Sequence, residues 1–212
     1  MARNETFFID GPAGRLEALL QHPEGPPRGG ALVCHAHPLQ GGIMHFKLVF
    51  RAAKVLQEAG YACLRFNFRG VGGSAGVHDG GIGEQDDVRA ALGELDRRFP
   101  GLPQILGGFS FGSVMALEVA ATLPRAHGLF GLGFPLRNIP DPSFLSRIKA
   151  PLLLIQGERD PFGPGGDLRN LLSQLKIRAE LEIVPGADHF FTGLEAQAME
   201  LLRGFVTALP PP

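Results

Sequence analysis

The sequence predicts an α/β fold in which a mostly parallel β-sheet is covered by helices on both faces. Short apolar segments alternate with segments whose apolar residues recur at helical spacing, from about residue 31 to the end of the chain. The apolar segments are continuous, which is typical of strands buried on both faces. Glycine and proline are plentiful, at 30 and 18 residues, and favour tight connections between short elements.

The chain opens with two strand-like segments. Residues 6–10 (TFFID) and 15–23 (RLEALLQHP) flank the sequence GPAG. This turn chemistry and the partial alternation of apolar and polar residues predict an antiparallel hairpin. A polar, proline-rich stretch, EGPPRGG, then separates the hairpin from the alternating part of the chain.

The alternating part supplies the remaining strands and the helices. Further strands are predicted at residues 31–37, 61–68, 104–109, 127–134, 151–157 and 179–184. Helices are predicted at residues 44–59, 84–99, 113–123, 167–175 and 194–209, the first of them stopped by Gly60. With the hairpin, these strands predict one sheet of about seven to eight strands with helices on both faces.

The length of 212 residues fits a single domain, 1–212, with a sizeable core. Residues 136–149, between two predicted strands, are too few to form a lid domain. We therefore expect a substrate pocket that is open or covered only by loops.

The composition is that of an ordinary globular protein, with 44% hydrophobic residues, 19% charged residues and a net charge of −1. This balance gives no electrostatic reason to expect nucleic acid or an anionic membrane as a partner. No apolar run approaches the length of a membrane span. The first residues, MARNETFFID, lack the apolar core of a secretory signal, and we expect a cytoplasmic protein. Cys34 and Cys63 lie in apolar segments and are expected to be free, buried thiols.

The motif G-x-S-x-G occurs at residues 108–112, between a predicted buried strand and a predicted helix. A tight turn there forces the serine into a strained backbone conformation, and the two glycines keep side chains from colliding. The oxygen of Ser110 would then stand exposed at the carboxyl edge of the sheet, above a helix N-terminus that favours negative charge. This context predicts a nucleophile, whereas the alternative is a serine that only caps the helix.

A nucleophilic serine needs a base, and the base needs an orienting acid. Asp160 follows the predicted strand at 151–157, and His189 follows the next strand along the chain. Both loops should open at the same sheet edge as Ser110, because parallel strands share a direction. Glu158 is a competing acid, but it lies closer to its strand than Asp160. Asp188 is another, but it directly precedes His189 in the sequence, and neighbouring side chains rarely point at each other. We predict a triad of Ser110, Asp160 and His189.

The sequence resembles the α/β-hydrolase superfamily over nearly its whole length. It is most similar to small, lidless bacterial hydrolases with an HPHP…GG loop after the third strand and an R-F-N-F-R-G-x-G-x-S-x-G segment after the fourth. In this chain the two segments are HAHPLQGG at residues 35–42, called the HAHP loop below, and RFNFRGVGGSAG at residues 65–76. The segments GFSFG and GADHFF add to the resemblance. Ala36 stands where the family loop usually has proline. A broader similarity extends to dienelactone hydrolases, which use a cysteine where this chain has Ser110.

The resemblance implies an oxyanion hole made of two backbone N–H groups, and a triad in the chain order serine, acid, histidine. One N–H would be that of Phe111, directly after the nucleophile. The other comes from the HAHP loop, where alignment with the commoner H-G-x-P form puts His37 at the donor position. Pro38 has no N–H, and Leu39 is the alternative donor. Each such donor is typically worth about 3–4 kcal/mol of transition-state stabilisation.

The two glycine-containing loops also allow other interpretations. A metal site in the HAHP loop would need further ligands, and His45 is the only close candidate, so no metal or cofactor is predicted. His35 is expected to be a buried histidine with a structural hydrogen bond. The loop RGVGGSAG lacks the Lys-Ser/Thr pair of a phosphate-binding loop. Within it, Arg69 is expected to be a structural hydrogen-bonder rather than a substrate contact.

These observations predict a serine hydrolase that cleaves esters of small to medium acyl groups through an acyl-enzyme. The predicted pocket walls are Leu39, Phe134, Phe162 and Phe190. A thioesterase, amidase or lactonase could use the same triad, and a non-catalytic binding module could use the same fold. The expected partner is a small-molecule acyl substrate, and the expected assembly is a monomer or a homodimer.

Overall fold

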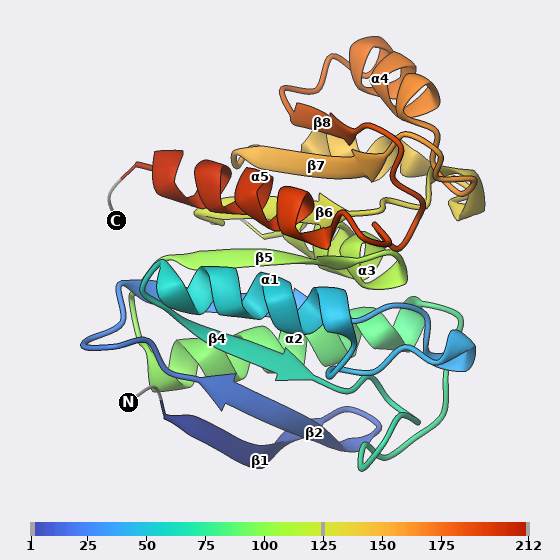
Figure 1. Cartoon of the computed structure of the whole chain (residues 1–212). Helices are drawn as coiled ribbons and strands as arrows, with labels where there is room; N and C mark the ends of the chain where they lie inside the picture. The colour runs from blue at the N-terminus through green and yellow to red at the C-terminus, as the bar shows by residue number, and fades with distance from the viewer. Residues whose placement is uncertain (1–2, 124–125, 211–212) are drawn as a thin grey trace.

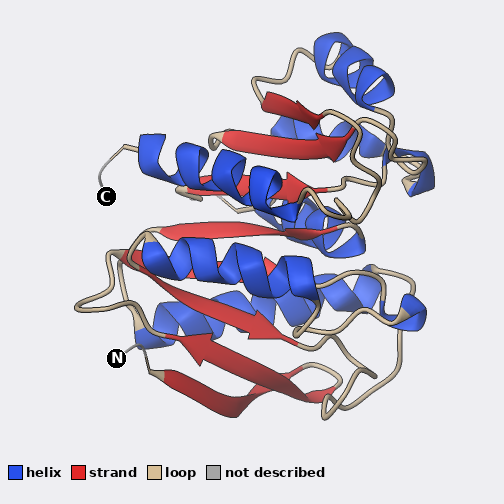
Figure 2. Ribbon diagram, in the orientation of Figure 1, coloured by secondary structure: helices blue, strands red, loops and turns tan. Residues whose placement is uncertain are grey.

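The described strands join one sheet, and it is parallel except at its N-terminal hairpin (Figures 1 and 2). The computed structural model describes residues 3–123 and 126–210. The strands are β1 Asn4–Gly11, β2 Gly14–Gln21, β3 Gly29–Cys34, β4 Tyr61–Phe66, β5 Gln104–Phe109, β6 Gly128–Leu132, β7 Leu152–Gly157 and β8 Glu180–Val184. Their order is β1-β2-β4-β3-β5-β6-β7-β8, with antiparallel pairing only of β2 with β1 and β4. The predicted fold class is confirmed.

Burial explains why the sequence pattern distinguished the strands. Every residue of β3, β4, β6 and β7 is buried, and these are the strands with continuous apolar runs. The edge strand β8 alternates between exposed and partly buried residues, as its sequence ELEIV alternates between charged and apolar ones. A strand with helices on both faces must be apolar throughout, whereas an edge strand needs only one apolar face.

The helices form a layer on each face of the sheet. Their bounds are α1 Lys47–Glu58, α2 Ile82–Arg98, α3 Phe111–Ala120, α4 Gly165–Gln174 and α5 Glu195–Ala208. Figure 1 shows α1 and α5 side by side on one face, with α2 and α3 on the other. Each face has its own apolar core, one built with α2 and α3 and the other with α1 and α5.

The first helix begins at Lys47, three residues later than the predicted start at 44. The preceding backbone is used elsewhere: the Met44 N–H donates to Asn67 Oδ1 at 2.8 Å, and the Met44 carbonyl accepts from the buried Arg65 guanidinium at 2.6 Å. Phe46 is extended, with φ −56° and ψ 139°. Apolar spacing continues through these residues, but their hydrogen bonds hold them out of the helix.

The segment between β6 and β7 contains two short 3₁₀ helices, η2 Leu136–Asn138 and η3 Pro142–Arg147, in place of a lid domain. Within the residues that the structure describes, no helix is long and apolar enough to cross a membrane.

The sheet order places a crevice at the carboxyl ends of β3 and β5. After β3 the chain moves to β4 on one side, whereas β5 pairs with β3 on the other side. Loops that leave two such strands diverge, which opens a crevice between them where ligands bind in open α/β sheets. The HAHP loop and Ser110 both lie at this point.

Candidate active site

Ser110 occupies a sharp turn between β5 and α3. Its backbone has φ 54° and ψ −122°, a strained conformation for a residue with a side chain. The flanking glycines are required by the neighbouring β3 backbone. A Cβ at Gly108 would lie 2.6 Å from the Cys34 carbonyl oxygen, and one at Gly112 would lie 2.4 Å from it. The G-x-S-x-G segment therefore forms the predicted elbow against the end of β3.

Ser110, His189 and Asp160 form a continuous chain of hydrogen bonds. The Ser110 Oγ lies 2.9 Å from His189 Nε2, and His189 Nδ1 lies 2.7 Å from Asp160 Oδ2. Because a carboxylate only accepts, Nδ1 carries the proton and Nε2 is left to accept the serine hydroxyl proton. The three side chains that the sequence analysis selected are thus brought together in the geometry of a serine nucleophile, its base and an orienting acid.

Asp160 is buried and held by further donors. Gln156 Nε2 donates to Asp160 Oδ2 at 2.7 Å, and the Phe162 N–H donates to Oδ1 at 2.9 Å. The side-chain oxygen Oε1 of Gln156 accepts in turn from the Phe134 N–H. The sequence analysis did not select Gln156, although a lone amide in the apolar strand LLLIQG was the available signal.

The two competing acids, Glu158 and Asp188, accept hydrogen bonds from backbone N–H groups in turns of the chain. Glu158 Oε2 accepts from the Gly186 N–H at 2.7 Å. Asp188 Oδ1 accepts from the N–H groups of Phe190 and Thr192, and these hydrogen bonds, led by that of Thr192, hold the pKa of Asp188 below its usual range. Asp188 thereby shapes the loop that carries His189.

His35 is a structural histidine, as expected. It is wholly buried, its Nδ1–H donates to the Ala36 carbonyl at 2.6 Å, and its Nε2 accepts from the Phe68 N–H at 3.0 Å. Burial lowers its pKa to about 4. The side chain joins the HAHP loop to the loop after β4. Arg69, in that second loop, pairs with the buried Asp87 through its guanidinium and its backbone N–H, and so is also structural.

The HAHP loop turns tightly around the His37 carbonyl, which accepts from the N–H groups of Gln40 and Gly42 at 3.0 Å. The Leu39 N–H is occupied, because it donates to His37 Nδ1 at 3.2 Å. Among the described residues, no acceptor takes the N–H of His37 or of Phe111. This geometry favours His37 over Leu39 as the second donor.

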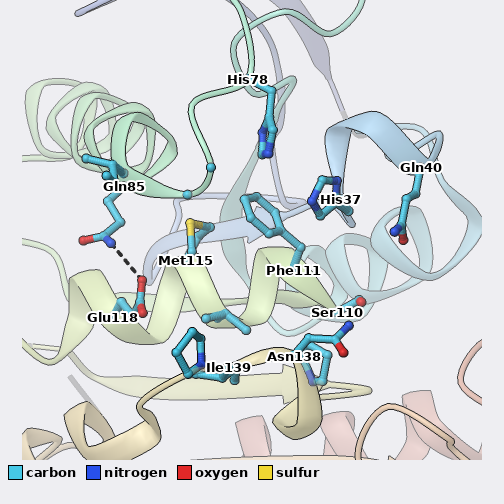
Figure 3. Close-up of a pocket in the computed structure, with 16 residues that line it drawn as sticks. His37, Gln40, His78, Gln85, Ser110, Phe111, Met115, Glu118, Asn138 and Ile139 are labelled. Atoms are coloured by element: carbon cyan, nitrogen blue, oxygen red, sulfur yellow. Dashed lines mark hydrogen bonds between the residues drawn. The ribbon is translucent and has the colours of Figure 1, made fainter.

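A cavity of about 480 Å³ opens beside Ser110. Figure 3 shows His37 and Ser110 at one end of it and Gln85 with Glu118 at the other. The side chains that line it come from the HAHP loop, the loop after β4, α2, α3 and the segment after β6: His37, Gln40, His78, Ile82, Gln85, Ser110, Phe111, Val114, Met115, Glu118, Pro135, Asn138, Ile139 and Pro140.

None of the four side chains predicted as pocket walls lines this cavity. Phe134 is wholly buried, and Leu39 is 74% exposed. The rings of Phe162 and Phe190 pack against the His189 imidazole, with centroids 4.8 and 5.2 Å from it. The walls of this cavity come largely from α2, α3 and the segment after β6, which only the fold brings together.

His78 is a cavity residue that the sequence analysis missed. Its Nδ1 lies 2.8 Å from Oε1 of Glu84, a wholly buried carboxylate at the start of α2. Burial opposes ionisation of Glu84, but the N–H groups of Asp79 and Gly81 hold its pKa below the usual value. The His78 ring lies 4.7 Å from that of His37. No motif marks this pair, since it depends on a loop of irregular structure.

Comparison with known proteins agrees with this geometry. A family model described as an alpha/beta hydrolase domain matches residues 30–203. An uncharacterized protein of Rickettsia prowazekii (strain Madrid E) is 37% identical over 193 residues, which is 87% of this chain and 81% of that protein.

Two solved structures are similar over nearly the whole chain. XC6422 of Xanthomonas campestris, described as an α/β serine hydrolase without lid, is 34% identical with a TM-score of 0.90, covering 99% of this chain and 97% of that one. An α/β serine hydrolase homologue from Coxiella burnetii is 35% identical with a TM-score of 0.87, covering 94% and 96%.

Proposed function

Because the chain belongs to the α/β-hydrolase family, and is therefore a hydrolase, we propose that it is a serine esterase acting on carboxylic esters. The observation that carries this proposal is the hydrogen-bonded chain from Ser110 through His189 to Asp160, with Ser110 at the mouth of a cavity. The proposal assigns these residues as nucleophile, base and orienting acid.

In the first step, Ser110 Oγ attacks the ester carbonyl carbon while its proton passes to His189 Nε2. The imidazolium that forms is stabilised by Asp160, whose Oδ2 accepts from Nδ1–H. The carbonyl oxygen becomes an oxyanion and accepts hydrogen bonds from the N–H groups of Phe111 and His37. Both groups lack a protein acceptor within the described residues, so they are available for it.

The tetrahedral intermediate then collapses. The bond from carbon to the alcohol oxygen breaks, and this oxygen takes the proton from His189 Nε2 to leave as a neutral alcohol. The acyl group remains on Ser110 as an ester. A water molecule then attacks the acyl carbon and gives one proton to His189 Nε2. The bond from this carbon to Ser110 Oγ breaks, Oγ takes the proton back from Nε2, and the carboxylic acid leaves with Ser110 restored.

An ester is the substrate class that the site favours. The short segment between β6 and β7 leaves the cavity accessible, and the cavity mixes apolar walls such as Val114 and Ile139 with a few polar side chains. An alcohol leaves more readily than an amine, so an ester makes a smaller demand than an amide on the acid at His189.

Hydrolysis of a short p-nitrophenyl ester tests the proposal. The wild-type protein should release p-nitrophenol, and Ser110→Ala should lower kcat by roughly a thousandfold or more. Ser173→Ala, at an exposed serine of α4, is the matched control and should hydrolyse the ester at the wild-type rate. Equal rates in wild type and Ser110→Ala would contradict the proposal. A panel of matched thioesters, amides and lactones would show whether another acyl bond is cleaved faster.

A further inference from the structure

The cavity extends from Ser110 along one face of α3. Phe111, Met115 and Glu118 follow one another on this face at helical spacing, and all three line the cavity. Glu118 lies eight positions after Ser110, which corresponds to about 12 Å along the helix. A second hollow of about 230 Å³ begins at the same Gln85 and Glu118 and continues toward Arg147.

Glu118 places a carboxylate at the far end of this cavity, next to apolar walls. Gln85 Nε2 donates to Glu118 Oε2 at 2.8 Å, across the end of the cavity (Figure 3). Among the described residues, Gln85 is the one donor to this carboxylate, and Oε1 is left to accept from a ligand. Desolvation by burial raises the pKa of Glu118, and the nearby Arg147 opposes this.

Folding alone gives no reason to place the Glu118 carboxylate at this position. A partly desolvated carboxylate with one amide partner destabilises the folded state relative to an apolar or amide residue at the same place. Polar groups placed in a mostly apolar pocket are the features that orient a ligand. The unfilled acceptor capacity of Glu118 therefore points to a hydrogen-bond donor on the substrate.

The arm of the substrate that reaches Glu118 follows from the positions of the catalytic groups. The leaving alcohol must lie beside His189 Nε2, and His189 does not line the cavity. Phe111 and His37, which face the oxyanion, do line it. The remaining substituent of the carbonyl carbon, the acyl chain, is thus the one directed along α3.

We propose that Glu118 is a specificity-determining residue that accepts a hydrogen bond from a hydroxyl or ammonium group near the end of the acyl chain. The preferred substrates are then esters of medium-length acids that carry such a donor. This inference rests on the proposed esterase function and assigns its substrate class.

Three p-nitrophenyl esters test the inference: nonanoate, ω-hydroxyoctanoate and ω-aminooctanoate. Their acyl chains match in length when the terminal methyl, hydroxyl or ammonium group is counted. The wild-type protein should show kcat/KM at least about tenfold higher for the two donor-bearing esters than for nonanoate. In Glu118→Met this ratio should fall to about one for both. In Glu118→Gln, which keeps an acceptor but no charge, the preference for the ammonium ester should fall more than that for the hydroxyl ester.

Ratios within each variant cancel changes that affect all substrates alike. Glu182→Met, at an exposed position of the edge strand β8, is the matched control and should keep the wild-type ratios. If Glu118→Met fails to fold, as thermal unfolding would show, Glu118→Gln carries the test, because its amide can still pair with Gln85.

The outcomes separate the two proposals. Absence of hydrolysis of every ester, including p-nitrophenyl acetate, would overturn the esterase function together with the inference. Hydrolysis without a preference for donor-bearing chains would overturn only the role of Glu118. So would a preference that survives both Glu118 variants.

Discussion

The two histidines that approach Ser110 contribute through different atoms. The His189 imidazole is hydrogen-bonded to the serine hydroxyl, and the His37 ring accepts from the Leu39 N–H, so that in the proposed mechanism His37 acts only through its backbone N–H. We predict that His189→Ala lowers kcat for a p-nitrophenyl ester by roughly a thousandfold or more. His37→Ala keeps the backbone donor and should cost less than about tenfold. Steady-state kinetics on purified variants checks both values, and equal losses would show that the His37 ring takes part in the reaction.

His35 should make the protein sensitive to acid. Its pKa is about 4 in the folded protein and 6.5 when unperturbed. Between these pH values the unfolded chain binds a proton at His35 and the folded chain does not, so the free energy of unfolding falls as pH falls. The loss is on the order of 3 kcal/mol by pH 4.

Urea unfolding at pH 7 and pH 4.5 measures this dependence. His35→Gln keeps an acceptor for the Phe68 N–H but cannot be protonated. It should be less stable at pH 7 and show a flatter pH dependence than wild type. An unchanged pH dependence in the variant would assign the acid sensitivity to other groups.

Among individual residues, those whose roles follow from a motif or from the direction of a strand could be predicted from the sequence. Ser110, Asp160 and His189 follow buried parallel strands, so their loops had to meet at one edge. Glu84, Gln85 and Glu118 could not be found in this way, because they lie on helices, where neither a motif nor a strand direction shows which polar side chain is buried or faces a cavity.

The HAHP loop shows how one element depends on a single glycine. Gly42 donates to the His37 carbonyl, and a Cβ there would lie 1.9 Å from the Ala36 carbonyl oxygen. We predict that Gly42→Ala displaces the His37 N–H and lowers kcat by on the order of a hundredfold. Ester kinetics together with a melting temperature would check this.

The neighbouring Gly41 is the matched control. It has φ 79°, and a Cβ there would meet nothing within 4 Å. Gly41→Ala should therefore cost about 1–2 kcal/mol of stability through backbone strain and retain most of the activity. If Gly41→Ala and Gly42→Ala lose activity equally, the close approach of Gly42 to Ala36 is not what positions the donor.

Elements were predictable where apolar periodicity and burial coincide. β5 was predicted with the bounds it has, because its apolar run ends where the elbow begins. The start of α1 was predicted too early, since Arg65 and Asn67, distant in sequence, bind the backbone of Met44. Long-range hydrogen bonds of this kind leave no local signal.

Across the whole molecule, one sheet joins the elements that carry Ser110, Asp160 and His189. The two apolar cores lie on opposite faces of that sheet. Strands β3, β5 and β7 each contribute side chains to both cores. We predict a single cooperative unfolding transition in calorimetry, with calorimetric and van't Hoff enthalpies that agree. Two resolved transitions, or a van't Hoff enthalpy well below the calorimetric one, would show that the chain unfolds in separate units.

Covalent labelling of Ser110 tests the central claim most directly. A fluorophosphonate probe should react with the wild-type protein to give one adduct by intact-protein mass spectrometry, mapped by peptide analysis to Ser110. Ser110→Ala should give none, and His189→Ala should label far more slowly, because the base that accepts the serine proton is absent. Wild-type protein that stays unlabelled, or labels equally well after either substitution, would contradict the assignment of Ser110 as a nucleophile activated by His189.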